Sequence, residues 1–178
     1  YDRDLRDVLS IQNEVALAIA REIEIRLSPA EETQLAESRP VDPETYELYL
    51  RGMFHLTSYT PDGFEKGIAL LHEAVARDPT EPLPYAQLAL GYAQVGHGPG
   101  GPPDAFPKAM AAARRALALD PHLAEAHGAL AEALIYYEWD WAKAGVSYQR
   151  ALELNPNLAA VRAHYAYYHA LFGRKEEA

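Results

Sequence analysis

Apolar side chains return every three to four residues along the first part of the chain. Between residues 8 and 27 they mark one face of a helix whose other face is charged, at Val8, Ile11, Val15, Ile19, Ile23 and Leu27. This period predicts an amphipathic helix. Ser28, Pro29 and Glu31 then have the spacing of a cap, a first-turn proline and a capping-box acid. A short second helix is therefore expected to end near Ser38, before the linker RPVDP at 39–43.

A different pattern repeats beyond residue 43, and the prolines of DP and NP pairs mark it. Pro43, Pro79, Pro121 and Pro156 are 36, 42 and 35 residues apart. Twelve and five residues before the last three prolines the side chain is always small: Gly67, Ala109 and Ala144, then Ala74, Ala116 and Ala151. Nine and ten residues after them a larger residue precedes an alanine: Leu88 and Ala89, Leu130 and Ala131, Tyr165 and Ala166.

These spacings indicate two helices in each repeat. Small side chains let two helices cross closely, and larger ones fill the space beside the crossing. A proline has no backbone N–H to donate to the preceding helical turn. Each marker is therefore expected to close the second helix of its repeat. The predicted fold class is all-α, an α-solenoid of antiparallel helix pairs.

Turn residues divide the repeats in the same way. Asp62, Asp104 and Asp140 each stand before a proposed second helix, where a carboxylate can accept free backbone donors. The segment GHGPGGPPD at 96–104 accounts for the longest interval and is expected to be a loop between two helices. It contains G-x-G-x-x-G, but a dinucleotide site needs a preceding strand, and here a helix is predicted to precede it.

The repeats resemble the tetratricopeptide repeat. The likeness is carried by EPLPYAQLALGYAQVG, AFPKAMAAARRALALDP and LAEAHGALAEALIYYEWDWAKAGVSYQRALELNP. His127 and Arg162 replace its usual aromatic residue. The resemblance implies about three and a half repeats in a domain at 41–178, at about 43–79, 80–121, 122–156 and a partial 157–178.

Residues 1–40 are expected to be the remnant of an upstream domain and a linker. The opening YDRDLRDVLSIQNEVALAIAREI resembles the end of the TolB-like segment that precedes such repeats in large bacterial regulators. That resemblance implies a winged-helix, cyclase or kinase head further upstream.

Composition excludes several classes of site. The formal net charge is −10, which opposes the counterion release that drives nucleic-acid binding. The chain has no cysteine, so disulfides and thiolate metal sites are impossible. No apolar run reaches the roughly 20 residues of a membrane-spanning helix. We expect a cytoplasmic protein.

No metal, cofactor or catalytic residue is predicted. His122 and His127, like His164 and His169, are five residues apart, which separates the rings around a helix, unlike the four-residue spacing of zinc-binding helices. His127 and His169 are expected to be packing residues. In WDW at 139–141, Asp140 is interpreted as a helix cap and the tryptophans as a cover for the turn. An enzyme would need polar groups such as His164, Glu132 and Glu125 to converge around a metal or ligand.

The tetratricopeptide resemblance implies a concave groove on the first helices of successive repeats. It maps this partner-binding groove onto Leu50, Arg51, Phe54, Leu83, Ala86, Gln87, Leu90, Glu125, Glu132, His164 and Tyr167. Chaperone-binding members carry basic residues and Asn in this row. Here Glu125 and Glu132 would repel an acidic tail, so an apolar or weakly basic helix or segment is the expected protein partner. The alternative is that these residues only pack helix on helix.

The expected function is that of a protein-interaction scaffold within a larger bacterial signalling or regulatory protein. The alternative is an intramolecular regulatory domain that controls an upstream cyclase, kinase or DNA-binding head. VRAHYAYYHALF at 161–172 carries apolar side chains that no second helix follows to cover. This end, or the N-terminal helix, is therefore expected to support a possible homo-oligomer.

Overall fold

The computed structural model describes residues 42–98 and 100–173, and these residues form helices and no strand. The helices are α3 (Pro43–Leu56), α4 (Pro61–Arg77), α5 (Pro82–His97), α6 (Ala105–Leu119), α7 (Ala124–Ala133), η1 (Leu134–Glu138), α8 (Trp141–Leu154) and α9 (Ala159–Leu171). The all-α prediction is confirmed. The predicted N-terminal helices and the TolB-like segment lie outside the described residues.

The chain divides into two compact units, residues 1–47 and residues 48–178. The described part of the first unit is short and begins α3. There the Asp42 carboxylate accepts hydrogen bonds from the backbone N–H and the hydroxyl of Thr45, both at 2.9 Å. The first backbone N–H groups of a helix have no acceptor within the helix. Asp42 thus caps the first turn of α3 by accepting one of them.

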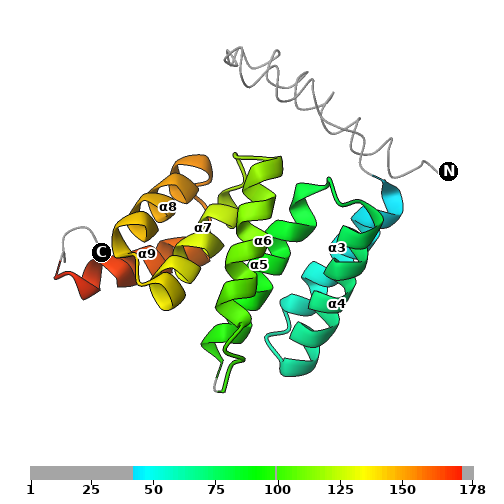
Figure 1. Cartoon of the computed structure of the whole chain (residues 1–178), viewed down its shortest axis with the longest axis horizontal. Coiled ribbons are helices and arrows are strands. Elements are labelled where there is room, and N and C mark those ends of the chain that lie inside the picture. The colour runs from blue at the N-terminus through cyan, green and yellow to red at the C-terminus, as the bar shows by residue number, and fades with distance from the viewer. Residues whose placement is uncertain (1–41, 99, 174–178) are drawn as a thin grey trace, which may run out of the picture. The chain divides into compact units, whose positions relative to one another are not determined.

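In the second unit, the helices follow one another along a row. Figure 1 shows this order from α4 to α9, with no helix at the centre of a closed ring. The predicted small positions explain the close packing. Ala74, Ala116 and Ala151 are all 0% exposed, and Gly67, Ala109 and Ala144 are buried as well.

Glycine is needed where two helices approach too closely for a side chain. A Cβ added to Gly67 would lie 2.9 Å from the carbonyl oxygen of Gly52 and 2.8 Å from Leu56. The contact joins α3 to α4 within one repeat. Between repeats, Ala89 of α5, Ala113 of α6 and Ala129 of α7 form a core cluster. The recurring small residues therefore set the distances between the helices.

One of the three predicted aspartate caps is confirmed. Asp140 Oδ1 accepts the backbone N–H of Lys143 at 3.0 Å. In α4 the cap is Thr60, whose hydroxyl accepts the N–H of Gly63 at 3.1 Å. Asp62 instead lies in the first turn and pairs with Lys66, because Pro61 starts the helix earlier than predicted. Asp104 stands at the cap position of α6 but makes no capping hydrogen bond.

The predicted loop at 96–104 is present but starts later. Gly96 and His97 still belong to α5, where a Cβ on Gly96 would lie 2.8 Å from the Phe106 ring. Gly100 has a φ of 73°, a left-handed conformation that glycine adopts without strain. The longer helix places His97 where a loop had been expected.

The segment WDW follows an irregular helix end. The π-helix η1 prolongs α7, and Trp139 then has a φ of 55°. Trp141 packs against the core, but Trp139 is 70% exposed. The Trp139 ring lies 6.4 Å from that of Trp141, and its cover of the turn stays a prediction.

Candidate functional site

A small pocket lies between the first helices of two successive repeats, α3 and α5. It has a volume of about 130 Å³ and is lined by Met53, Leu56, Thr57, Tyr59, Gln87, Leu90 and Gln94. Gln87 and Leu90 were predicted as groove residues. The lining carries no acidic or basic side chain, so this part of the groove suits an uncharged side chain.

The residues predicted for the groove on α3 do not line this pocket. Leu50 is 42% exposed and Phe54 is 74% exposed, and Arg51 is also exposed. Met53 and Thr57 take their place in the lining. A difference of one residue turns a side chain by about 100° around a helix, so Met53 lies on a different face of α3 from Phe54.

The remaining predicted residues of α5 and α7 differ in exposure. Ala86 is 2% exposed and packs with Ala116 and Ala126, so it belongs to the core between helices. Leu83 and Glu125 are half-buried. In the part of the chain that the structure describes, the ion pairs of Glu132 join it to His97 and His164 and do not include Glu125.

Three helices meet in a cluster of ionisable side chains, which we call the His–Glu–His cluster: His97 of α5, Glu132 of α7 and His164 of α9. His97 Nε2 lies 2.9 Å from Glu132 Oε2, and His164 Nδ1 lies 2.5 Å from Glu132 Oε1. The second distance is that of an ion pair, although its orientation is not that of a hydrogen bond. The side chain of Glu132 is 7% exposed, against 33% and 45% for the histidines.

Aromatic rings hold one side of the cluster. The His97 ring meets Tyr136 edge to face with centroids 4.6 Å apart, and it meets Phe106 in the same way at 5.2 Å. Phe106 and Tyr136 stack on each other at 5.3 Å. Tyr167, a predicted groove residue of α9, is 57% exposed and is close enough to Tyr136 to affect its pKa. His97 is thus fixed on two sides while part of its ring faces solvent.

The contacts between these groups determine their charge. Burial alone would raise the pKa of Glu132, but the two histidines outweigh it and the pKa lies below its ordinary value. The Glu132 carboxylate in turn raises the pKa of His164 against the effect of burial. Burial also raises the pKa of Tyr148, which stays neutral. Glu132 is therefore ionised at neutral pH, and a histidine nitrogen lies against each of its two carboxylate oxygens.

The cluster does not form a metal site of the usual kind. Within residues 42–98 and 100–173, no group of three His, Cys, Asp or Glu side chains is placed to hold a metal ion. His164 and Glu132 do meet, as an enzyme site would have required, but their partner is His97 rather than Glu125. The arrangement ties three repeats together and presents two imidazole rings to the groove.

The repeat pattern gave no signal for His97, Phe106 or Tyr136. His97 comes 18 residues after Pro79, Glu132 comes 11 after Pro121, and His164 comes 8 after Pro156. Because these are three different repeat positions, comparing repeats cannot align them. The packing role predicted for other histidines is seen: His169 is 6% exposed, and His127 Nε2 lies 3.0 Å from the carbonyl oxygen of Pro121.

Comparison with solved structures identifies the architecture. The tetratricopeptide domain of Sgt2 from Aspergillus fumigatus is 20% identical, with a TM-score of 0.59 over 77% of this chain and 84% of that one. The first such domain of Spaghetti (RPAP3), solved with the HSP90 peptide SRMEEVD, is 18% identical, with a TM-score of 0.58 over 73% of this chain and 96% of that one. The fold is the tetratricopeptide solenoid.

Comparison by sequence finds a distant relative of this chain. A putative adenylate cyclase 3 of Rhizobium meliloti (strain 1021) is 28% identical over 136 residues, which cover 75% of this chain and 23% of the relative. The chain thus spans less than a quarter of that relative's length. No family model matches the chain. In the part of the chain that the structure describes, no helix has the length and apolar character to cross a bilayer.

Proposed function

We propose that this chain is a protein-interaction module that binds a peptide or helix along the first helices of its repeats. One observation carries the proposal: these helices leave a pocket between α3 and α5, and beyond it exposed aromatic side chains border the His–Glu–His cluster. Open rows of helix pairs offer this kind of continuous concave surface. The Spaghetti domain with its HSP90 peptide has the same fold.

The partner is an apolar or weakly basic segment. The α3–α5 pocket has an uncharged lining and favours an apolar side chain. Leu50, Phe54 and Tyr167 add exposed apolar surface on the same set of helices. Glu125 remains as an acidic group in the predicted row, whereas the charge of Glu132 is largely compensated by the histidines. The proposed setting is a bacterial signalling or regulatory protein in the cytoplasm.

Groove variants of the intact protein test this function. Thr57→Arg places a long cation in the pocket, and Tyr167→Asp puts a charge on an exposed aromatic position. Both should reduce recovery of the native partner in an affinity purification followed by mass spectrometry. Tyr137→Asp, at a residue that is 51% exposed on η1 and outside the predicted groove, is the matched control. If both groove variants keep their circular dichroism spectrum and recover the same partners as the wild type, the groove is not the binding site.

The similarity to the putative adenylate cyclase favours a second function. The match covers less than a quarter of that relative, so most of the relative lies outside the region that resembles this chain. In this alternative, the array controls a catalytic or DNA-binding head of its own polypeptide. Tyr167→Asp in the full-length gene product should then change the activity of the head without any added protein. A gene that encodes no head, or a head whose activity is unchanged by the variant, excludes this alternative.

A further inference from the structure

Two pockets lie away from the predicted groove, between successive second helices. The α4–α6 pocket has a volume of about 360 Å³ and the α6–α8 pocket about 490 Å³. Each has the intervening first helix as its floor. Leu88 and Tyr92 of α5 occupy the floor of the former. Leu130 of α7 and Leu134 of η1 occupy the floor of the latter.

The two pockets are built from equivalent positions of the repeats. Leu88 and Leu130 both stand nine residues after a marker proline, and Tyr92 and Leu134 both stand thirteen after it. Their walls correspond as well. Lys108 and Lys143 both precede a marker by thirteen residues, and Ala111 and Val146 precede it by ten. The chain thus repeats one apolar pocket on both sides of α6.

The linings of these pockets differ in charge from the chain as a whole. The linings contain Lys108, Arg114, Arg115 and Lys143 together with His72, and neither contains an Asp or Glu. Helix α6, which contributes to both pockets, holds three of these cations and no acid in its 15 residues. The chain as a whole has a net charge of −10. The basic residues are therefore concentrated around the two apolar floors.

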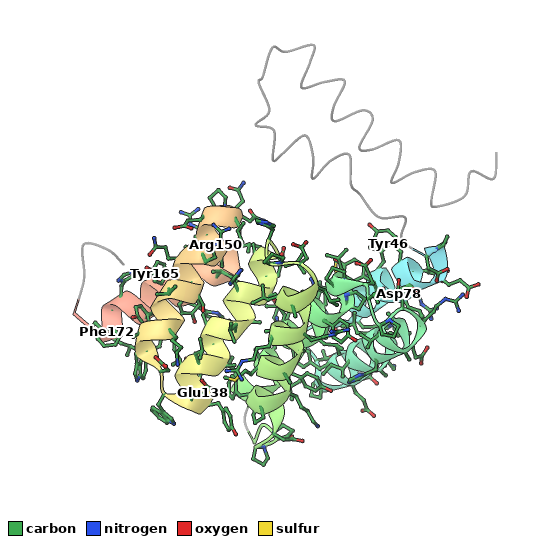
Figure 2. The ribbon with its side chains drawn as sticks, turned by 45° about the horizontal axis from the view of Figure 1, so that its top comes forward. Tyr46, Asp78, Glu138, Arg150, Tyr165 and Phe172 are labelled. Carbon is green, nitrogen blue, oxygen red and sulfur yellow. The ribbon has the colours of Figure 1, made fainter. Side chains whose placement is uncertain are left out.

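Acidic neighbours already contact most of these cations, but only at the surface. Lys108 pairs with Asp104 at 2.7 Å, and Lys143 pairs with Asp140 at 2.6 Å. Arg114 pairs at 2.9 Å with Glu138, which Figure 2 labels near the lower end of the drawn helices. The lysine side chains are 51% and 71% exposed, and that of Arg114 is 59% exposed. Exposed pairs contribute at most about 1 kcal/mol each, so a partner's carboxylates can replace them at little cost.

We infer that the α4–α6 and α6–α8 pockets together bind an acidic amphipathic helix of another protein, which lies across α6. The two pockets lie on opposite sides of α6, so a helix that crosses α6 can place one large apolar side chain in each of them. Acidic side chains beside them meet the cations of α6 and α8, and this charge complementarity selects the partner.

A displayed library of random 16-residue peptides tests this binding on the intact chain. Peptides enriched on the wild type should be acidic and should carry large apolar residues on one face of a helix. Ala111→Glu and Val146→Glu each place a carboxylate at an exposed position of one pocket wall. Each should weaken the selected peptides at least tenfold in fluorescence anisotropy, and raised salt should weaken binding to the wild type.

Phe54→Glu is the matched control, since it adds the same charge at an exposed apolar residue of α3. It should leave the affinity unchanged, as should Tyr167→Asp in the predicted groove, so that failure here leaves the proposed function standing. The inference is overturned if no peptide is enriched, if the enriched peptides are basic, or if both wall variants bind them like the wild type. It is also overturned if Val146→Glu instead dissociates a dimer in sedimentation experiments, because the occupant is then a second copy.

Discussion

The α3–α5 pocket and the His–Glu–His cluster lie on the same set of first helices but differ in whether their buried polar atoms have partners. In the pocket, Gln94 Oε1 is buried and has no hydrogen-bond partner among the described residues. In the cluster, both oxygens of Glu132 are in contact with a histidine. The comparison teaches that one fold can carry an uncharged pocket and an ionisable cluster on the same set of helices, because alanine and glycine contacts elsewhere hold the helices together.

The largest expected effect on the free energy of unfolding comes from substitutions in the core around each region. Tyr148 is 1% exposed and its ring lies 5.5 Å from Tyr165 and 6.1 Å from Tyr168. Tyr148→Ala should lower the free energy of unfolding by about 3–5 kcal/mol, as for other large aromatic residues. Leu71→Ala, near the pocket and 0% exposed, should cost about 2–5 kcal/mol. Urea denaturation measures both, and a loss below about 1 kcal/mol for either would contradict its place in the core.

Replacing the two buried polar groups by leucine should separate the two regions. Glu132→Leu removes the acceptor shared by His97 and His164 and should cost about 1–3 kcal/mol. Gln94→Leu removes an unpaired oxygen and should be neutral or slightly stabilising. Urea denaturation at pH 6 gives both values. Equal losses in the two variants would show that polar satisfaction does not distinguish the regions.

The cluster should make stability depend on pH near neutrality. The raised pKa of His164 stabilises the fold fully below its ordinary value of 6.5, and this contribution is lost as the pH rises through the folded pKa. The lowered pKa of Glu132 stabilises the fold above its ordinary value of 4.5, and this contribution is lost as the pH falls through the folded pKa. The stability difference between wild type and Glu132→Gln should therefore peak between pH 4.5 and 6.5 and shrink by pH 9.

Thermal unfolding of both proteins across this range measures the difference. Gln94→Leu is the control and should differ from the wild type by a constant amount. A difference between wild type and Glu132→Gln that stays constant from pH 5 to pH 9 would rule out the assigned ion pair.

The smallest effects concern two left-handed residues that are not glycine, each between paired helices. Tyr59 has a φ of 51° and Trp139 a φ of 55°. Glycine relieves this backbone strain but adds disorder to the unfolded chain, so Trp139→Gly should raise the free energy of unfolding by at most about 1 kcal/mol. Tyr59→Gly should gain less, because Tyr59 also lines the pocket and meets the Phe64 ring at 6.2 Å. Differential scanning calorimetry would detect a reversed order.

The fold was predictable because small residues recur in a fixed register. Ala74, Ala116 and Ala151 were predicted from spacing alone, and each is fully buried. The loop after α5 was also predictable, since closely spaced prolines and glycines disfavour a helix there. The start of α4 at Pro61 and the irregular end at Trp139 were missed, because a threonine cap and a π-helix depend on hydrogen bonds that the repeat pattern does not encode.

The candidate site was predictable only in part. Gln87 and Leu90 line the α3–α5 pocket, whereas Leu50 and Phe54 do not, because a pocket between two helices is lined by a different face of each. Glu132 and His164 were chosen as separate groove residues. That they share an ion pair, and that His97 completes it, was not visible in the spacing.

The sequence alone determined that helices pair and stack, because the size of a side chain at a crossing limits how close two backbones can come, and this size recurs along the chain. The tertiary structure decided which polar side chains meet. His97, Glu132 and His164 stand at three different repeat positions, and their contact depends on the crossing angles and helix ends that bring α5, α7 and α9 together. Those angles are set by the packing of many residues at once, so no single motif records them.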